Sequence, residues 1–222
     1  MANGVVSMQI VVVANQKGGV GKSTIACNLA VAFALDRKRV LLIDADTQES
    51  SIGFRAVREK DDIKAISITK PTIHKDAVGF ENFEVVIVDA GGRDSSVFRS
   101  AIMAASRGIL LIPTLPSVYD IWATEDTLKV LSDARAFTDI PAYLLINQVI
   151  KANIVKEAEE ALKELANQYG VEVMKTKLFS RVAFRNSVKE GKGVLEMNDR
   201  KARSEMEALY EEVKERLPSS VS

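Results

Sequence analysis

The chain has 222 residues, of which 47% are hydrophobic and 27% are charged, a composition that supports one compact domain with a sizeable core. Its 30 basic residues balance its 30 acidic residues, so overall charge predicts no partner, and an electrostatic partner must be sought in local clusters. The only cysteine, Cys27, excludes an internal disulfide and a cysteine-built metal site, and favours a reducing, cytoplasmic setting.

We expect no targeting signal at the beginning of the sequence. Its first apolar run is short, follows no basic start and ends in polar residues and glycines, which excludes a signal peptide and a membrane span. We expect residues 1–7 to form a flexible arm and residues 1–222 to form a single domain.

Further along the chain, apolar runs alternate with helical patterns. The runs are rich in Val, Ile and Leu without polar alternation, which is typical of strands covered on both faces of a parallel sheet. Helical spacing lies between them, as in Ile25–Leu35 and Tyr119–Phe137, and predicts a doubly wound α/β fold with a mostly parallel sheet flanked by helices. The predicted strands are Ile10–Ala14, Val40–Ile43, Val85–Val88, Ile109–Ile112 and Tyr143–Ile146, with a weaker sixth at Val171–Leu178.

The strongest local signal is a glycine-rich segment between the first strand and the first helix. Its glycines let backbone N–H groups converge on phosphate oxygens at a helix N-terminus, Lys22 can reach the β- and γ-phosphates, and the Ser23 hydroxyl can coordinate Mg²⁺. Gln16 stands where the strict phosphate-loop pattern has glycine; the alternative is a glycine-rich turn with a chance lysine, which the coincidence of strand, glycines and helix disfavours. The predicted nucleotide-binding residues are Lys17, Gly18, Gly19, Val20, Gly21, Lys22, Ser23 and Thr24.

Carboxylates follow the next two predicted strands. Asp44 and Asp46 come after the second strand and Asp89 after the third. Ligands of open α/β sheets bind at the carboxyl ends of the strands, and Mg²⁺ prefers one or two carboxylates with phosphate oxygens and water. Aspartate after a strand also caps helices and forms turns, and this alternative stays open for each one taken alone.

These segments resemble the ParA/MinD superfamily of deviant-Walker P-loop ATPases, in the SIMIBI class. The loop is similar to the family's motif Lys-Gly-Gly-x-Gly-Lys-Thr/Ser, and Asp44–Gln48 to its Asp-x-Asp-Pro-Gln motif, with Thr47 in place of proline. Ala90-Gly91 replaces the usual Thr-Pro or Cys-Pro, as in the short ParF-like branch. The resemblance runs from Lys17 to Lys192 and implies a Mg·ATP-binding ATPase without a separate N-terminal DNA-binding domain.

The resemblance also implies roles for individual residues. Lys17 corresponds to the signature lysine that reaches a partner subunit's phosphates, and Asp46 to the residue that positions the attacking water. With Lys22 these form the expected catalytic set, whereas Ser23, Asp44 and Asp89 form the expected metal site. Asn147, at the end of the fifth strand, is similar to an adenine-contacting asparagine, although a turn asparagine is equally consistent with its position.

The last third of the chain is locally basic. Residues 175–203 hold nine basic and three acidic side chains, and four basic ones recur at helical spacing, which fits contacts to a DNA backbone. The resemblance to the ParA region of nonspecific DNA binding favours this hypothesis over a solvated charged face. The expected DNA-binding residues are Arg181, Arg185, Lys189 and Lys192.

The function that these features favour is a ParA-type partition ATPase. ATP would form a homodimer that binds nonspecific DNA in the nucleoid, and a centromere-binding, ParB-like protein would stimulate slow hydrolysis and segregate a plasmid or chromosome. The alternative is a MinD- or FlhG-like positioning ATPase at membranes, but the acidic polar face of the last helix argues against a membrane partner. An iron–sulfur reductase and an ATP-dependent ligase fit less well. We expect Trp122 to pack rather than to bind a ligand, and we assign His74 no role.

Overall fold

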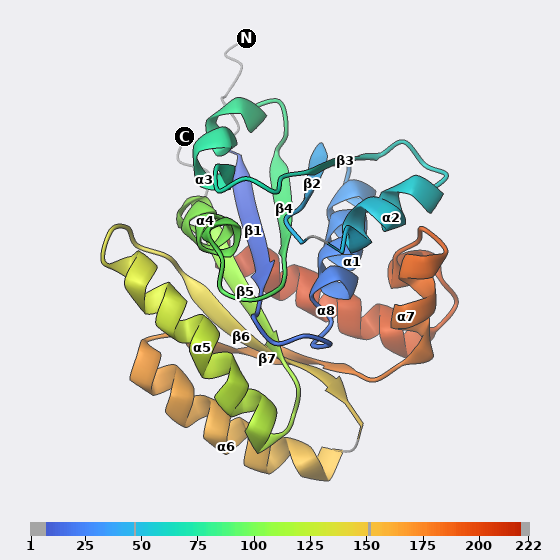
Figure 1. Ribbon diagram of the computed structural model, residues 1–222. Helices are drawn as coiled ribbons and strands as arrows, with labels where there is room; N and C mark the ends of the chain where they lie inside the picture. Colours follow the sequence, from blue (N-terminus) through green and yellow to red (C-terminus); the bar gives the residue numbers. More distant parts are fainter. Residues whose placement is uncertain (1–7, 47, 151, 219–222) are drawn as a thin grey trace.

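The computed structural model describes residues 8–46, 48–150 and 152–218; the expected arm at residues 1–7 lies outside them. Within these ranges the chain forms a seven-stranded sheet whose neighbouring strands are all parallel, in the order β3-β2-β4-β1-β5-β6-β7 (Figure 1). The strands are β1 (Gln9–Ala14), β2 (Val40–Asp44), β3 (Ile63–Ser67), β4 (Val85–Ala90), β5 (Gly108–Thr114), β6 (Ala142–Val149) and β7 (Glu172–Phe179).

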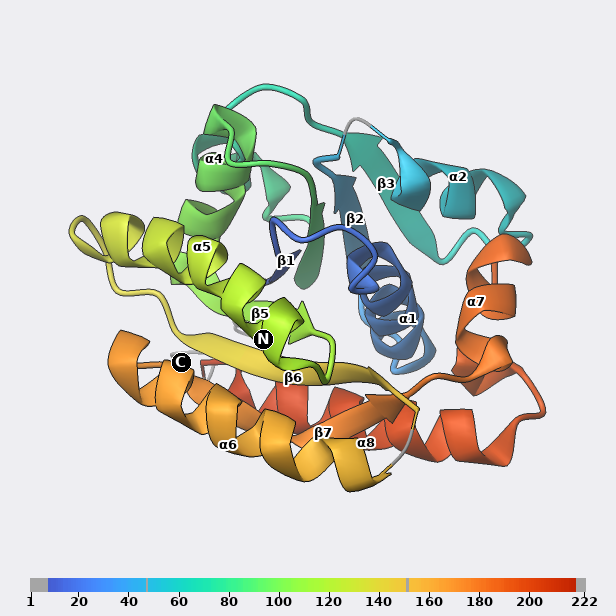
Figure 2. The ribbon, with the colours of Figure 1, turned by 60° about the horizontal axis from the view of Figure 1, so that its bottom comes forward.

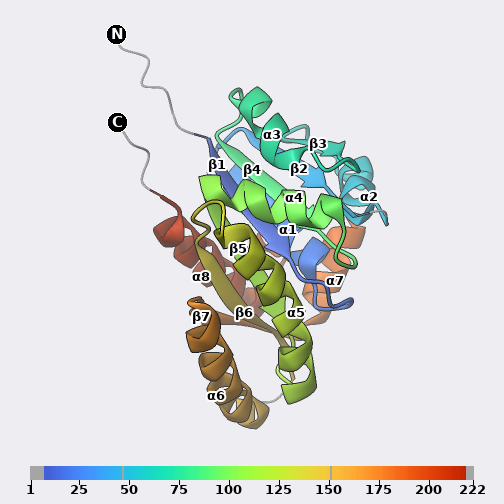
Figure 3. The ribbon, with the colours of Figure 1, turned by 60° about the vertical axis from the view of Figure 1, so that its left-hand side comes forward.

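Helices cover both faces of the sheet, which confirms the predicted doubly wound fold (Figures 2 and 3). One face is covered by α1 (Lys22–Leu35), α2 (Ser50–Val57), α7 (Val182–Lys189) and α8 (Arg200–Arg216). The other is covered by α3 (Ile73–Asp76), α4 (Ser96–Ala104), α5 (Val118–Arg135) and α6 (Ala152–Tyr169). Short 3-10 helices occupy Ala77–Phe80, Ala105–Arg107 and Val194–Glu196.

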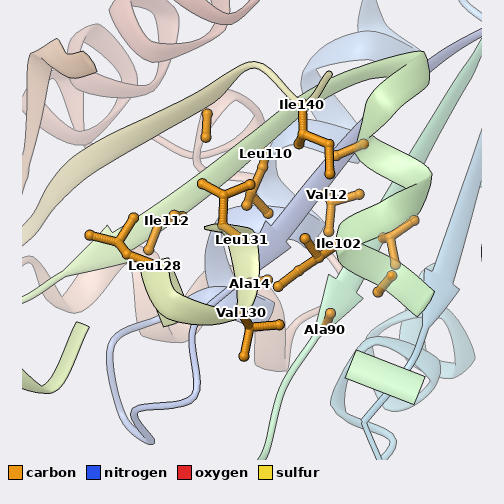
Figure 4. Packing of buried hydrophobic residues seen from close by; sticks show 14 of the residues in the cluster. Val12, Ala14, Ala90, Ile102, Leu110, Ile112, Leu128, Val130, Leu131 and Ile140 are labelled. Carbon is orange, nitrogen blue, oxygen red and sulfur yellow. The ribbon is translucent and has the colours of Figure 1, made fainter. Parts of the chain in front are cut away.

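The hydrophobic core is split by the sheet into two clusters. Along β1, Val12 and Ala14 belong to the cluster under α4 and α5, whereas Val11 and Val13 belong to the cluster under α1 (Figure 4). Because a strand directs alternate side chains to opposite faces, a strand covered on both faces needs apolar residues at every position. This explains why the central strands appear in the sequence as unbroken apolar runs.

The six predicted strands are all present, and the structure adds β3. Its sequence IKAIS includes a lysine and a serine, and its side chains are mostly exposed because β3 lies at the edge of the sheet. Trp122, which was expected to pack, is largely exposed. Trp122 is 61% exposed and Tyr119 is 80% exposed, and the two rings meet edge to face at the start of α5 with their centroids 5.8 Å apart.

The last helix, α8, packs its apolar face on the core. Met206, Leu209 and Val213 are fully buried, and the buried Glu212 carboxylate accepts hydrogen bonds from the backbone N–H groups of Lys175 and Thr176, each at 2.8 Å. In the part of the chain that the structure describes, no helix combines the length and the apolar character needed to cross a membrane.

Two glycine substitutions should separate a close backbone approach from ordinary helix propensity. A Cβ on Gly108 would lie 1.9 Å from the carbonyl oxygen of Ile10 on the neighbouring strand, so Gly108→Ala should lower the free energy of unfolding by at least about 2 kcal/mol. Gly53, exposed inside α2, has no atom within 4 Å of such a Cβ, so Gly53→Ala should raise stability by roughly 0.5–1 kcal/mol. Urea unfolding of both variants tests the pair, and equal effects would contradict it.

Candidate functional site

The site lies at the carboxyl edge of the sheet, where β1, β4 and β2 end side by side. The strand register pairs Asp44 with Asp89, and Asp89 with Val13 of β1. The glycine-rich loop leaves β1 at this edge and leads into α1. Parallel pairing therefore brings together the two acidic segments and the loop that the sequence places far apart.

The loop wraps around the side chain of Lys22, the first residue of α1. Gly19 and Gly21 have φ angles of 78° and 89°, a region that side chains disfavour, and Gly21 caps α1. The Lys22 ammonium donates to the carbonyl oxygen of Lys17 at 3.0 Å. Burial lowers the pKa of Lys22, while the carboxylates of Asp89 and Asp46 act in the opposite direction. The buried Lys22 ammonium is thus held by the loop backbone within reach of the charges of Asp89 and Asp46.

Lys17 contacts the N-terminal end of α5. Its ammonium lies 3.6 Å from Asp120 Oδ1, and its side chain remains 44% exposed. Asp120 also accepts a hydrogen bond from the Ser117 hydroxyl, and Ser117 caps α5 by accepting from the Asp120 N–H at 3.2 Å. The predicted signature lysine is therefore held by a single ion pair within its own subunit.

A buried polar network fixes the start of the loop against α5. The Asn15 side chain donates to Pro113 O at 2.9 Å and to Thr124 Oγ1 at 3.1 Å, and its oxygen accepts from the Lys17 N–H and the Thr127 hydroxyl. The Gln16 N–H donates to Thr127 Oγ1 at 2.9 Å. Asn15, Thr124 and Thr127 lie outside the glycine-rich motif, and the sequence gave no signal for the two threonines.

Asp46 lies over Gly91, close to Lys22. A Cβ on Gly91 would lie 1.8 Å from Asp46 Oδ2 and 3.1 Å from Lys22 Cε, so a side chain at this position would displace the charged groups. Asp46 Oδ1 accepts from the Gln48 N–H at 3.0 Å. The lack of a side chain at Gly91 thus leaves the room that Asp46 occupies.

The two strand-end aspartates differ in how their oxygens are used. Asp44 accepts three backbone N–H bonds, from Asp46 at 3.0 Å, Ser51 at 2.7 Å and Ile52 at 3.0 Å, so it organises the loop and the start of α2. Asp89 Oδ2 accepts the Ser51 hydroxyl at 2.6 Å. Asp89 Oδ1 is the one buried side-chain oxygen or nitrogen, among the residues that the structure describes, without a hydrogen-bond partner.

Burial raises the pKa of Asp89 to about 6, although the hydroxyls of Ser51 and Ser23 and the charge of Lys22 partly oppose this. A buried, unpaired carboxylate oxygen is costly unless something pairs with it. A divalent cation, or a water molecule bound to one, is the kind of partner that such an oxygen accepts.

On the other side of the loop, Asn147 and Gln148 bind its backbone. Asn147 Nδ2 donates to Val20 O at 2.7 Å and Gln148 Nε2 donates to Gly19 O at 2.8 Å. With Phe179, Arg181 and Arg185 they line a hollow beside the first turn of α1. The amide of Asn147 keeps its oxygen as an acceptor at this hollow.

The four predicted DNA-binding residues do not form one helical stripe. Arg181 precedes α7 and donates two hydrogen bonds to the Oε1 atom of Glu205, and Lys192 follows the helix and pairs with Glu190 at 3.2 Å. Arg185 and Lys189, one turn apart on α7, are exposed and make no ion pair within the described part of the chain. The basic surface of α7 is therefore narrower than the sequence predicts.

Comparison with known proteins agrees with this geometry. The profile of the CobQ/CobB/MinD/ParA nucleotide binding domain matches residues 11–194. The chain is 28% identical to maintenance of carboxysome distribution protein A of Halothiobacillus neapolitanus over 93% of its length and 95% of that protein's. It is 30% identical to the protein of the same name from Gloeobacter kilaueensis, covering 94% of each chain. The chromosome-partitioning ATPase Soj of Thermus thermophilus is 31% identical over 57% of this chain and 62% of its own.

Solved structures show the same fold. Apo McdA from Cyanothece superposes with a TM-score of 0.78 at 17% identity, covering 93% of this chain and 99% of that one. An ATP complex of a Cyanothece McdA variant gives 0.70 at 18% identity, over 97% and 99% of the two chains. The septum site-determining protein MinD of Pyrococcus horikoshii, complexed with Mg-ADP, gives 0.74 at 16% identity, over 93% and 96%.

The polar network under the loop can be tested on stability. Thr127→Val removes the oxygen that pairs with the Gln16 N–H and the proton that Asn15 accepts, and should lower the free energy of unfolding by about 1–3 kcal/mol. Ser132→Ala, on the exposed side of the same helix, should change it by less than about 0.5 kcal/mol. Denaturant unfolding measures both, and a neutral Thr127→Val variant would mean that the network does not hold the loop.

Proposed function

Because the chain belongs to the CobQ/CobB/MinD/ParA nucleotide-binding family, we propose that it is a Mg·ATP-dependent ATPase that dimerises on ATP and positions a cargo along DNA. The proposal separates into a nucleotide site, a dimer and a cargo. Each of these rests on different residues.

The observation that carries the nucleotide site is the unpartnered Asp89 Oδ1 beside Lys22. Across residues 8–46, 48–150 and 152–218, no group of three or more His, Cys, Asp or Glu side chains is arranged to hold a metal ion. A cation at Asp89 would therefore take most of its ligands from phosphates and water, which is how Mg²⁺ is usually held with nucleotides. Asp89 and the Ser23 hydroxyl are the residues that fit Mg²⁺, while Asp44 acts by organising the loop.

The proposed chemistry is transfer of the γ-phosphoryl group to water. Mg²⁺, when bound, neutralises charge on the phosphate oxygens. Lys22 and the loop N–H groups bind the phosphates, and Asp46, held by Gly91 close to Lys22, orients the attacking water. Asn147 presents its amide to the base in the neighbouring hollow.

The dimer rests on Lys17. An exposed ion pair of the Lys17–Asp120 kind contributes about 0–1 kcal/mol, so phosphates of a partner subunit can compete for this ammonium. The exposed aromatic pair Tyr119 and Trp122 lies on the same turn of α5 as Asp120 and would become covered in such a dimer. Lys17 would then complete the partner's site, which makes turnover slow without the dimer.

The proposal for the cargo rests on the basic residues of α7 and on the similarity to known proteins. Arg185 and Lys189 are the unpaired basic groups that would contact the backbone of nonspecific DNA. We propose segregation of plasmid or chromosomal DNA through a ParB-like partner. Similarity over nearly the whole chain to two carboxysome distribution proteins favours a second candidate, in which the cargo is a carboxysome-like body.

A membrane-acting, MinD-like function is the weaker alternative. The face of α8 that points to solvent carries Glu207, Glu211 and Glu215, which anionic lipid would repel.

Replacing Lys22 and replacing Lys17 should impair different steps, namely ATP binding and ATP-dependent dimerisation. Lys22→Ala should lose ATP binding because the phosphates lose their cation, whereas Lys17→Ala should bind ATP and remain a monomer. The measurements are fluorescent-nucleotide titration and light scattering on a sizing column with Mg·ATP and with Mg·ADP. A wild type that stays monomeric in Mg·ATP contradicts the proposed function, and a Lys17→Ala variant that dimerises normally removes Lys17 from the interface.

DNA binding should depend on α7 and on salt. Arg185→Ala with Lys189→Ala should weaken binding to two unrelated duplexes equally and reduce the log–log salt slope by about 1.8, because each lost phosphate contact contributes about 0.9. Lys156→Ala with Lys163→Ala, which removes the same charge from exposed positions of α6, is the matched control. An unchanged salt slope in the α7 variant would show that Arg185 and Lys189 are solvated and do not contact DNA. A strong preference for one duplex would show that the protein recognises bases.

A further inference from the structure

Ser51, the second residue of α2, holds both strand-end carboxylates. Its side chain is fully buried; its hydroxyl lies 2.6 Å from Asp89 Oδ2, and its backbone N–H donates to Asp44 Oδ2 at 2.7 Å. One residue thus joins the ends of β2 and β4 to the start of α2. Neither the motif nor the family comparison assigns it a role.

The direction of the hydrogen bonds follows from counting protons. An ionised carboxylate only accepts, so the Ser51 hydroxyl must donate to Asp89. The Cys27 sulfur lies 3.6 Å from Ser51 Oγ. Because the single Ser51 proton is already used, the Cys27 thiol is the donor in this contact, and its complete burial, which raises the pKa of the thiol, keeps that proton on the sulfur. The chain of donors runs from Cys27 through Ser51 to Asp89.

This chain decides which Asp89 oxygen remains free. The Ser51 hydroxyl holds Oδ2 and so restrains rotation of the carboxylate, and Oδ1 is left without a partner in the interior. We propose that Ser51 is a positioning residue for the cation: it fixes Asp89 so that Oδ1 is the oxygen offered to Mg²⁺ or to its bound water, and Cys27 fixes Ser51. The inference rests on the proposed Mg·nucleotide site and adds the residues that orient its carboxylate.

A merely structural role for Ser51 has a different signature. Loss of helix packing would lower stability and would weaken nucleotide binding with and without the cation. Loss of carboxylate orientation would raise the Mg²⁺ requirement alone, because hydrogen-bonding partners of metal ligands act on metal affinity, typically by 10–100-fold.

The test is a MgCl₂ titration of fluorescent MANT-ADP binding to the full chain, with a parallel measurement in EDTA. Ser51→Ala should raise the Mg²⁺ concentration for half-maximal enhancement by about 10–100-fold and leave the EDTA affinity unchanged. Cys27→Ala should produce a smaller rise, because the Ser51–Asp89 bond remains. Ser50→Ala, at the exposed neighbouring position, should match the wild type.

Three outcomes are separable. A Ser51→Ala variant with the wild-type Mg²⁺ requirement, or with an equal loss in EDTA, overturns the inference. If Ser51→Ala does not fold, as judged by circular dichroism, Ser51→Cys keeps a weaker donor of similar shape and should still raise the requirement; no rise overturns the inference. If MANT-ADP binding to the wild type does not depend on Mg²⁺, the proposed cation site is wrong, and with it the proposed nucleotide chemistry.

Discussion

The structure depends on the burial of two carboxylates and one ammonium at the carboxyl edge of a parallel sheet. Register places Asp44 and Asp89 opposite each other on β2 and β4, both fully buried, and the loop from β1 brings Lys22 against them. Like charges at this spacing repel, and burial penalises each charged form. The two carboxylates are stabilised to different degrees. Asp44 accepts three backbone N–H bonds, whereas Asp89 keeps one oxygen unpaired. That asymmetry ties Asp44 to the backbone, and the unpaired oxygen of Asp89 is the basis on which a ligand is proposed there.

The segments around these charges are held by contacts from distant elements. Asn15 and Thr127 fix the start of the loop, Asn147 and Gln148 bind its middle, and Gly91 leaves room for Asp46. The contacts of Asn15, Thr127, Asn147 and Gln148 position backbone, whereas Gly91 makes room for a side chain. A cradle of the kind proposed for phosphates works by preorganised N–H groups, so its precision would come from residues that touch no phosphate.

The sequence predicts what depends on local pattern and on chain order. Apolar runs predict six of the strands, and because a parallel sheet gathers the strand ends, the loop and the aspartates could be placed at one edge. Contacts that depend on helix phase and on distant pairing were not predictable. Asn15 and Thr127 are 112 residues apart, and nothing in the sequence distinguishes the buried Ser51 from the exposed Ser50. The predicted basic stripe was too wide for the same reason, because Arg181 forms an ion pair with Glu205 of the distant helix α8.

Helix α2 connects the sheet edge that carries Asp44 and Asp89 with the turn that follows the basic helix α7. Ser51 binds the aspartates at its start, and Arg58 follows its last turn, roughly 10 Å away at 1.5 Å per residue. The Arg58 side chain is 1% exposed and pairs with Asp62 at 2.7 Å, with Glu196 at 2.9 Å and with the Gly191 carbonyl oxygen in the turn after α7. Moving either end leaves a buried charge or carboxylate without its partner, which is strongly destabilising. The same rigid helix therefore constrains the geometry at Asp89 and the turn that ends the basic helix α7.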